Sequence, residues 1–102
     1  MKDGIIELGT KAGDELGFTS DKFMDGSYLW KVGDYIYISV VKLRERGKGY
    51  LSTLFANILS AGYGIKVPTP LPLMEKILKE KEFRKIAEYS ENVEVWAKEK
   101  NK

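Results

Sequence analysis

The segment YIYISVVKLRERGKGYLSTLFANILS, residues 35–60, changes its hydrophobic period, and this change constrains the fold more than any other feature of the chain. Apolar residues alternate in its first part, as in a β-strand. From Tyr50 onward they recur at steps of three and four residues, as in an amphipathic helix. A basic stretch with two glycines, Gly47 and Gly49, separates the two patterns. Strand and helix following each other in this way indicate an α/β fold.

A β-hairpin precedes the helix. β-branched and aromatic residues dominate SYLWKVGDYIYISVVKL, and Gly33-Asp34 is a suitable two-residue turn. This turn places Trp30 opposite Tyr37 and gathers the aromatic side chains on one face of the hairpin. The members of that face are Tyr28, Trp30, Val32, Tyr35 and Tyr37. Both faces are apolar, so we expect both to be covered.

The rest of the chain supplies the remaining elements of one mixed sheet. The helix should stop near Gly62, and GIKVP at 64–68 is typical of a short buried strand. A helix with Met74 and Ile77 on its apolar face follows. A second hairpin then completes the chain, with EFRKIAEY and VEVWAKE as its strands and SEN at 90–92 as its turn. We expect parallel strand–helix–strand crossovers with both helices on one face of the sheet.

The N-terminal residues are harder to interpret. We treat residues 1–26 as a variable segment of a single domain and residues 27–97 as its core. GIIEL at 4–8 is typical of a short strand, and the following residues have a broken pattern rich in turn residues. The sheet face opposite the helices is left to the first 25 residues or to another subunit. A homodimer through that face is therefore one alternative.

Composition excludes several classes of site. The 102 residues allow a single domain, and they include neither cysteine nor histidine. Disulfides, thiolate metal sites and the usual nucleophile–histidine catalysts are therefore excluded, and we expect no metal site. No apolar run approaches the ~20 residues that span a bilayer. The N-terminus MKDGIIELG has acids where a secretory signal would be apolar, so we expect a cytoplasmic protein without a membrane partner.

Positive charge is concentrated in the glycine loop. The net charge is only +2, which does not indicate a nucleic-acid partner, yet residues 42–48 carry four basic side chains against one acid. The loop lies where a strand ends and a helix begins, so main-chain N–H groups are free to bind an anion there. This arrangement predicts a phosphate or pyrophosphate site, with a solvated loop as the plainer alternative.

The same residues resemble a known family. VKLRERGKGYLSTLFANIL is similar to the V-x-P-x-x-R-G-K-G signature of the GNAT superfamily of acyl-CoA-dependent N-acyltransferases, and the likeness continues through GIKVPTPLPLMEKILKEKEFRKIAEY. It covers roughly residues 27–97. The short chain also resembles phage-encoded acetyltransferases in size. The matched positions are Val41, Leu43 in place of the usual proline, Arg46, Gly47, Lys48 and Gly49.

The resemblance implies a function and a cofactor. It implies an N-acetyltransferase that moves an acetyl group from acetyl-CoA to an amine of a protein or small molecule. In the family, the strand before the loop contacts the pantetheine arm of CoA, and the loop and helix start bind its pyrophosphate. By position, the strand contacts are Val40, Val41 and Lys42, and the pyrophosphate contacts are Arg46, Gly47, Lys48, Gly49, Tyr50 and Leu51.

Departures from the family keep a second interpretation open. Leu51 replaces the usual Gly or Ala, Leu71 a cofactor-binding asparagine, and Leu78 a tyrosine that protonates the leaving thiolate. The alternative is a GNAT-like module that binds CoA or a protein partner without catalysing transfer. The candidate acid and base are Tyr37 and Glu45, each with a structural alternative as a packed aromatic or a solvated charge. Acids that could face a cationic amine are Asp14, Glu15, Asp21 and Asp25.

Overall fold

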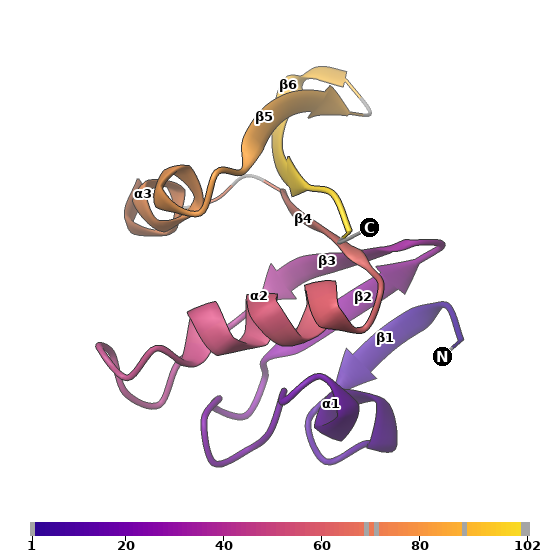
Figure 1. Ribbon diagram of the computed structural model, residues 1–102, viewed down its shortest axis with the longest axis vertical. Coiled ribbons are helices and arrows are strands. Elements are labelled where there is room, and N and C mark those ends of the chain that lie inside the picture. The colour runs from indigo at the N-terminus through magenta and orange to yellow at the C-terminus, as the bar shows by residue number, and fades with distance from the viewer. Residues whose placement is uncertain (1, 69, 71, 89, 101–102) are drawn as a thin grey trace.

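The computed structural model describes residues 2–68, 70, 72–88 and 90–100. The chain forms one six-stranded sheet with helices packed against it (Figure 1). The elements are, in chain order, β1 (Gly4–Glu7), α1 (Lys11–Glu15), β2 (Tyr28–Val32), β3 (Tyr35–Val40), α2 (Tyr50–Ser60), β4 (Gly64–Pro68), α3 (Pro72–Glu80), β5 (Arg84–Glu88) and β6 (Ser90–Lys98).

The sheet is mixed, with strand order β1-β2-β3-β4-β6-β5. Strands β3 and β4 pair in parallel, and all other neighbours pair antiparallel. The predicted α/β class with a single mixed sheet is confirmed. Strand β5 runs in the same direction as β4, but β6 lies between them. The two strands are therefore not neighbours.

The first hairpin follows the predicted register. Trp30 lies opposite Tyr37, and Val32 lies opposite Tyr35 across the Gly33-Asp34 turn. Beyond Leu29 the register shifts, because Tyr28 pairs with Val40 and not with Ser39. Ser39 is therefore the extra residue of a β-bulge in β3.

Helix α2 begins at Tyr50, as its apolar period indicates, and it ends at Ser60 just before Gly62. Gly62 has a φ of 94°, a left-handed conformation that glycine adopts at little cost and that stops the helix. Its apolar stripe is buried against the sheet. The buried members are Leu51, Leu54, Phe55 and Ile58.

One hydrophobic core joins α2 and α3 to the same face of the sheet. Phe55 of α2 packs against Phe83, which follows α3, with 5.2 Å between ring centroids. Leu78 of α3 and Trp96 of β6 belong to this core. The expectation that both helices share one face is confirmed. No helix in the described part of the chain is long and apolar enough to cross a membrane.

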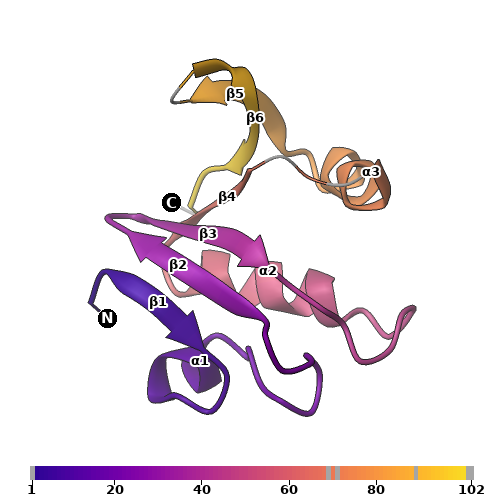
Figure 2. The ribbon, with the colours of Figure 1, turned by 180° about the vertical axis from the view of Figure 1, so that it is seen from behind.

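The N-terminal segment packs on the helix side of the sheet. The expectation that the first 25 residues could cover the opposite face is therefore wrong. Leu16, Phe18 and Phe23 are fully buried in the core shared with α2. The Asn57 side chain donates a hydrogen bond to the main-chain oxygen of Leu16 at 3.0 Å, which ties the segment to α2. Figure 2 shows β1, β2 and β3 with no helix in front of them.

The predicted turn of the second hairpin is also wrong. Residues 90–92 lie within β6, and Ser90 pairs directly with Glu88. Residue 89, between the bounds of β5 and β6, is outside the described residues. Pairing of Ser90 with Glu88 of β5 has outweighed the turn preference of serine.

Candidate functional site

Strands β3 and β4 are tied together at one end and separate at the other. Their parallel pairing covers Tyr35–Tyr37 against Gly64–Lys66, although β3 continues to Val40 and β4 to Pro68. At the tied end the Tyr35 ring packs directly on Gly64, because a Cβ at Gly64 would lie 2.6 Å from this ring. The separation therefore begins within two residues of a tight contact.

Two local features account for the separation. The bulge at Ser39 bends β3 after the last parallel pair. Pro68 has no N–H group and cannot donate to a neighbouring strand. Both features lie on the same side of the Tyr37–Lys66 pair. The strands consequently diverge toward the glycine loop.

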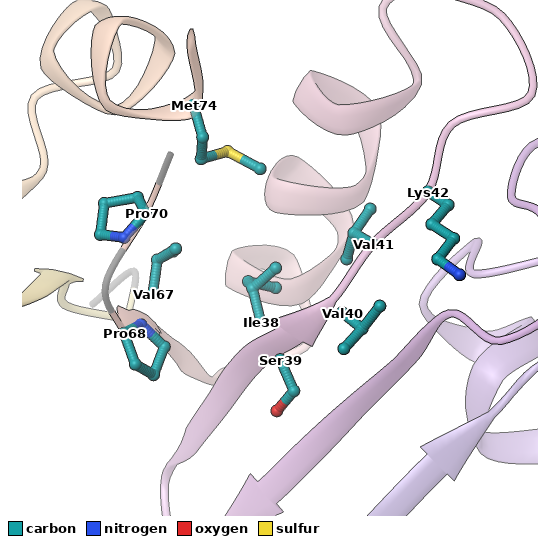
Figure 3. Close-up of a pocket in the computed structure, with 9 residues that line it drawn as sticks. All are labelled: Ile38, Ser39, Val40, Val41, Lys42, Val67, Pro68, Pro70 and Met74. Atoms are coloured by element: carbon teal, nitrogen blue, oxygen red, sulfur yellow. The ribbon is translucent and has the colours of Figure 1, made fainter. Parts of the chain in front are cut away.

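A pocket of about 310 Å³ occupies the space where the strands diverge (Figure 3). Ile38 and Val67 point into it from the two strands, and Met74 closes it from α3. Ser39 points to the other side of β3. The lining is mostly apolar and consists of Ile38, Ser39, Val40, Val41, Lys42, Val67, Pro68, Pro70 and Met74.

This pocket continues toward the start of α2. A second pocket, of about 360 Å³, shares Val41, Lys42 and Met74 with the first and adds Leu43, Arg46, Leu51 and Ile77. A third, of about 240 Å³, shares Leu43, Leu51 and Ile77 with the second. The third is otherwise lined by Glu45, Gly47, Gly49, Tyr50, Ser52, Glu80 and Lys81. We call the three pockets together the groove.

The N-terminus of α2 forms the polar end of the groove. Gly49 caps the helix with a φ of 73° and contributes no side-chain hydrogen bond, and the first turn carries no acid. The first main-chain N–H groups of a helix have no partner within it, and the helix dipole makes this end positive. The groove thus runs from an apolar slot to a set of main-chain donors.

The basic side chains of the loop have different roles. Arg46 lines the middle of the groove. Lys48 is exposed and pairs with the exposed Glu45 at 3.8 Å. Arg44 binds the main-chain oxygen of Ser20 through Nε, so the structure uses it to hold the loop in place.

The N-terminal segment holds the chain that leads into the loop. Ser27 Oγ accepts a 2.8 Å hydrogen bond from the main-chain N–H of Lys42, and Met24 N–H donates to the Lys42 oxygen at 2.7 Å. Phe23 and Leu43 form an isolated β-bridge next to these bonds. The wall of the groove is therefore supported by residues that the sequence pattern did not connect to it.

Most predicted cofactor contacts lie together in the groove. Of the two candidate acid–base residues, Glu45 lines the groove, whereas Tyr37 lies on the opposite face of the sheet in a separate pocket. Leu78 is fully buried in the core, and Leu71 is outside the described residues. Lys48 lies in the loop but does not line the groove. The predicted residues that line it are Val40, Val41, Lys42, Glu45, Arg46, Gly47, Gly49, Tyr50 and Leu51.

The four acids proposed to face an amine do not line the groove. Asp14 and Glu15 lie on α1, Asp25 is exposed in the following segment, and Asp21 accepts a hydrogen bond from the Thr19 hydroxyl. That hydrogen bond lowers the pKa of Asp21. Within the described ranges, no three His, Cys, Asp or Glu side chains are close enough to hold a metal ion.

Sequence reasoning missed part of the lining. The missed residues are Ile38, Ser39, Leu43, Ser52, Val67, Pro68, Pro70, Met74, Ile77, Glu80 and Lys81. Only indirect signals pointed to them: Pro68 ends a predicted strand, and Met74 and Ile77 belong to the apolar face of a predicted helix. Neither signal distinguishes a groove lining from an ordinary core contact.

Tyr35 and Glu99 form a polar cluster at the tied end of the strands. The Tyr35 hydroxyl donates a 2.6 Å hydrogen bond to Glu99, and this bond raises the pKa of Tyr35. Lys66 lies over the Tyr35 ring with 4.2 Å between Nζ and the ring centroid. The cluster lies at the opposite end of β3 from the glycine loop and does not line the groove.

The groove suits an elongated ligand with a slender, largely apolar arm and an anionic end. Its apolar slot lies between β3, β4 and α3, its donors lie at the start of α2, and Arg46 lines the middle of the groove between them. No protein-family model, curated protein or solved structure matches the chain.

Proposed function

We propose that the protein is an N-acetyltransferase that transfers an acetyl group from acetyl-CoA to an amine of a protein or small molecule. The observation that carries this proposal is the row of three pockets with shared lining residues, which leads from the separated strands β3 and β4 to the N-terminus of α2. The succession of elements after residue 27, together with the Arg46–Gly49 loop, supports the GNAT resemblance.

The groove residues fit the parts of the coenzyme. Main-chain donors beginning at Gly49, with Arg46 nearby, are suited to the pyrophosphate. The slot lined by Ile38, Val67 and Met74 is suited to the pantetheine arm, which is narrow and carries few charged groups. Gly47 and Gly49 leave room for close approach, because a Cβ at either position would meet no atom within 4 Å.

The chemistry that fits this chain is direct transfer. Without cysteine the chain has no thiol nucleophile, and without histidine it lacks the usual base that activates a serine for covalent acyl transfer. The protein would act by holding the thioester next to the attacking amine and by stabilising the carbonyl oxygen with a main-chain donor. Glu45 lines the polar end of the groove, so its role as a general base stays a prediction.

A non-catalytic CoA-binding module is the second candidate. Leu78, at the position of the family tyrosine that protonates the thiolate, is fully buried in the core. That position therefore packs the helix against the sheet and offers no hydroxyl to the groove. This observation favours binding without transfer.

Thermal unfolding with and without acetyl-CoA tests the binding step that both candidates share. A ligand at 100 times its dissociation constant should stabilise the native state by about 2.7 kcal/mol. Desulfo-CoA, which keeps the pyrophosphate and most of the pantetheine arm, is the matched control and should also stabilise. Unchanged melting with both ligands would refute the cofactor assignment.

Thiol release then separates the two candidates. The protein is incubated with acetyl-CoA and a panel of amines comprising a lysine peptide, a peptide with a free N-terminus and a polyamine. A transferase should release free CoA faster than the buffer blank and add one acetyl mass to an acceptor. Binding without such release from any amine, and without acetylation of the protein itself, would support the non-catalytic module.

A further inference from the structure

The Ser27 hydroxyl is buried and holds both main-chain groups of a residue in the groove wall. Ser27 lies just before β2 and keeps only 4% of its surface exposed. Its Oγ accepts a hydrogen bond from the Lys42 N–H at 2.8 Å and donates one to the Lys42 oxygen at 3.4 Å. A hydroxyl can do both, because it has one donor and two acceptor lone pairs. Lys42 lines the groove, so this contact joins the N-terminal segment to the candidate site.

Two further hydrogen bonds hold the same stretch of chain. Met24 N–H donates to the Lys42 oxygen at 2.7 Å, and Arg44 N–H donates to the Lys22 oxygen at 3.0 Å. Bonds at every second residue are the pattern of an antiparallel strand pair. Strand β3 has β2 on one side and β4 on the other, and these bonds continue the β2 side. The chain that follows β3 is therefore held extended along the N-terminal segment.

These bonds fix the direction of two peptide groups. In a trans peptide, the C=O and the N–H of one planar unit point in opposite directions. The Lys42 N–H points to Ser27, so the Val41 oxygen of the same unit points toward the groove. The Lys42 oxygen points to Met24, so the Leu43 N–H also points toward the groove. Val41 and Leu43 both line the groove, in agreement with this orientation.

An acceptor and a donor thus lie next to each other on the groove wall. In the part of the chain that the structure describes, neither the Val41 oxygen nor the Leu43 N–H has a hydrogen-bond partner in the protein. Strand β4 does not supply one, because its pairing with β3 ends at Tyr37. A ligand arm that carries amide groups can bind to both, and the pantetheine arm of CoA contains two amides.

We propose that Ser27 is a positioning residue for the ligand arm, an inference that rests on the proposed function of the groove as a coenzyme site. Its hydroxyl orients the Val41–Lys42 peptide so that the Val41 oxygen and the Leu43 N–H face an amide of the arm. Ser27 itself does not line the groove. Without the hydroxyl, the Lys42 N–H loses its acceptor, and the peptide is free to turn away from the ligand.

Calorimetry with CoA and with 3′,5′-ADP, which lacks the arm, tests this role. Ser27→Ala should weaken the binding of CoA by about tenfold, the scale of one hydrogen bond, and leave the binding of 3′,5′-ADP unchanged. Ser27→Thr keeps a hydroxyl at this position and should recover most of the affinity for CoA. Circular dichroism checks that each variant is folded at the temperature of the titration.

Asn57→Ala is the matched control for a general loss of stability. It removes the 3.0 Å hydrogen bond from the Asn57 side chain to the Leu16 oxygen, which also ties the N-terminal segment to the rest of the fold. This variant should melt at a lower temperature, but the ratio of its affinities for CoA and 3′,5′-ADP should equal that of the wild type. A ratio that changes in Ser27→Ala alone therefore reports positioning of the groove wall.

Amide hydrogen exchange measured by NMR gives a second readout at the proposed atoms. In the free protein, the Lys42 amide should exchange slowly, because it is bound to the buried Ser27 hydroxyl, and the Leu43 amide should exchange faster. CoA should slow the exchange of the Leu43 amide in the wild type. The same ligand should slow it less in Ser27→Ala.

Two results would overturn the proposal and leave the coenzyme site standing. The first is a Ser27→Ala variant that binds CoA as tightly as the wild type does. The second is a CoA complex of the wild type in which the Leu43 amide exchanges as fast as in the free protein. A wild-type protein that binds neither CoA nor 3′,5′-ADP would instead refute the proposed function, and the role of Ser27 with it.

Discussion

Replacing Gly49 by glutamate should abolish coenzyme binding while the domain stays folded. Gly49 lines the polar end of the groove and caps α2 at φ 73° and ψ 16°. A Cβ there would meet no atom within 4 Å, so the structural cost is the left-handed backbone alone, about 1–2 kcal/mol. A carboxylate at a helix start returns about 0.3–1 kcal/mol through the helix dipole. The net loss is small against a typical folding free energy of about 5–15 kcal/mol.

The effect on binding should be larger because the new carboxylate faces a pyrophosphate. Two unit charges at 4 Å repel by about 1 kcal/mol in bulk water and by about 4 kcal/mol at an effective dielectric constant of 20. Two phosphate charges therefore give about 2–8 kcal/mol of repulsion. Even the lower bound corresponds to about a 30-fold loss of affinity.

Isothermal titration calorimetry with CoA measures this loss, and Gly49→Gln is the matched control. Glutamine has nearly the same bulk and the same backbone cost as glutamate, but it carries no charge. We expect Gly49→Gln to weaken binding modestly and Gly49→Glu to weaken it strongly, with a difference that shrinks as salt screens the charges. Equal affinities of the two variants at low salt would refute an anion site at this helix start.

Three further predictions follow from other parts of the structure. Met74→Trp should fill the apolar slot and weaken the binding of acetyl-CoA in calorimetry. The binding of 3′,5′-ADP, which lacks the pantetheine arm, should be unaffected. Equal losses of affinity for both ligands would contradict the assignment of the slot. Phe18→Ala should lower the free energy of unfolding in guanidinium by about 3–5 kcal/mol, because Phe18 is fully buried and its ring centroid lies 5.0 Å from that of Phe23. A loss below about 1 kcal/mol, the scale of a surface substitution, would show that the N-terminal segment is not part of the core. The hydrogen bond from Lys31 lowers the pKa of Asp3 below its usual 3.8, so this pair stabilises the native state above that value and the contribution is lost as the pH falls through the lowered pKa. Between about pH 5 and about pH 2, the free energy of chemical unfolding should therefore decline less for Asp3→Asn than for the wild type. Parallel declines would exclude the Asp3–Lys31 pair as a cause of the acid destabilisation.

The parts of the fold that could be predicted are those set by local rules. The Gly33-Asp34 turn fixes the register of the first hairpin, because a two-residue turn places Val32 opposite Tyr35 and therefore Trp30 opposite Tyr37. Helix α2 was predictable for the same reason: its period and Gly62 are both contained in its own sequence. Local chemistry thus determines the register of this hairpin and the limits of α2.

The N-terminal segment could not be predicted because its contacts are distant in sequence. Phe18 and Phe23 lie in a stretch without a regular period, yet both are fully buried beside α2. The sequence pattern predicts Arg44 as part of an anion-binding loop, but its guanidinium donates a hydrogen bond to the main-chain oxygen of Ser20. Such assignments depend on which segments fold next to each other, and composition alone does not reveal that.

The groove itself arises from two irregularities that meet only in the folded sheet. Pro68 is visible in the sequence as a strand end, whereas the bulge at Ser39 follows from the pairing of β2 with β3. Either feature alone would disturb one strand, but together they end the β3–β4 ladder after three residue pairs. Because the glycine loop follows directly from β3, the divergence leads from the slot to the donors of α2. The position of the candidate site is therefore a property of the sheet, and the loop supplies only its polar end.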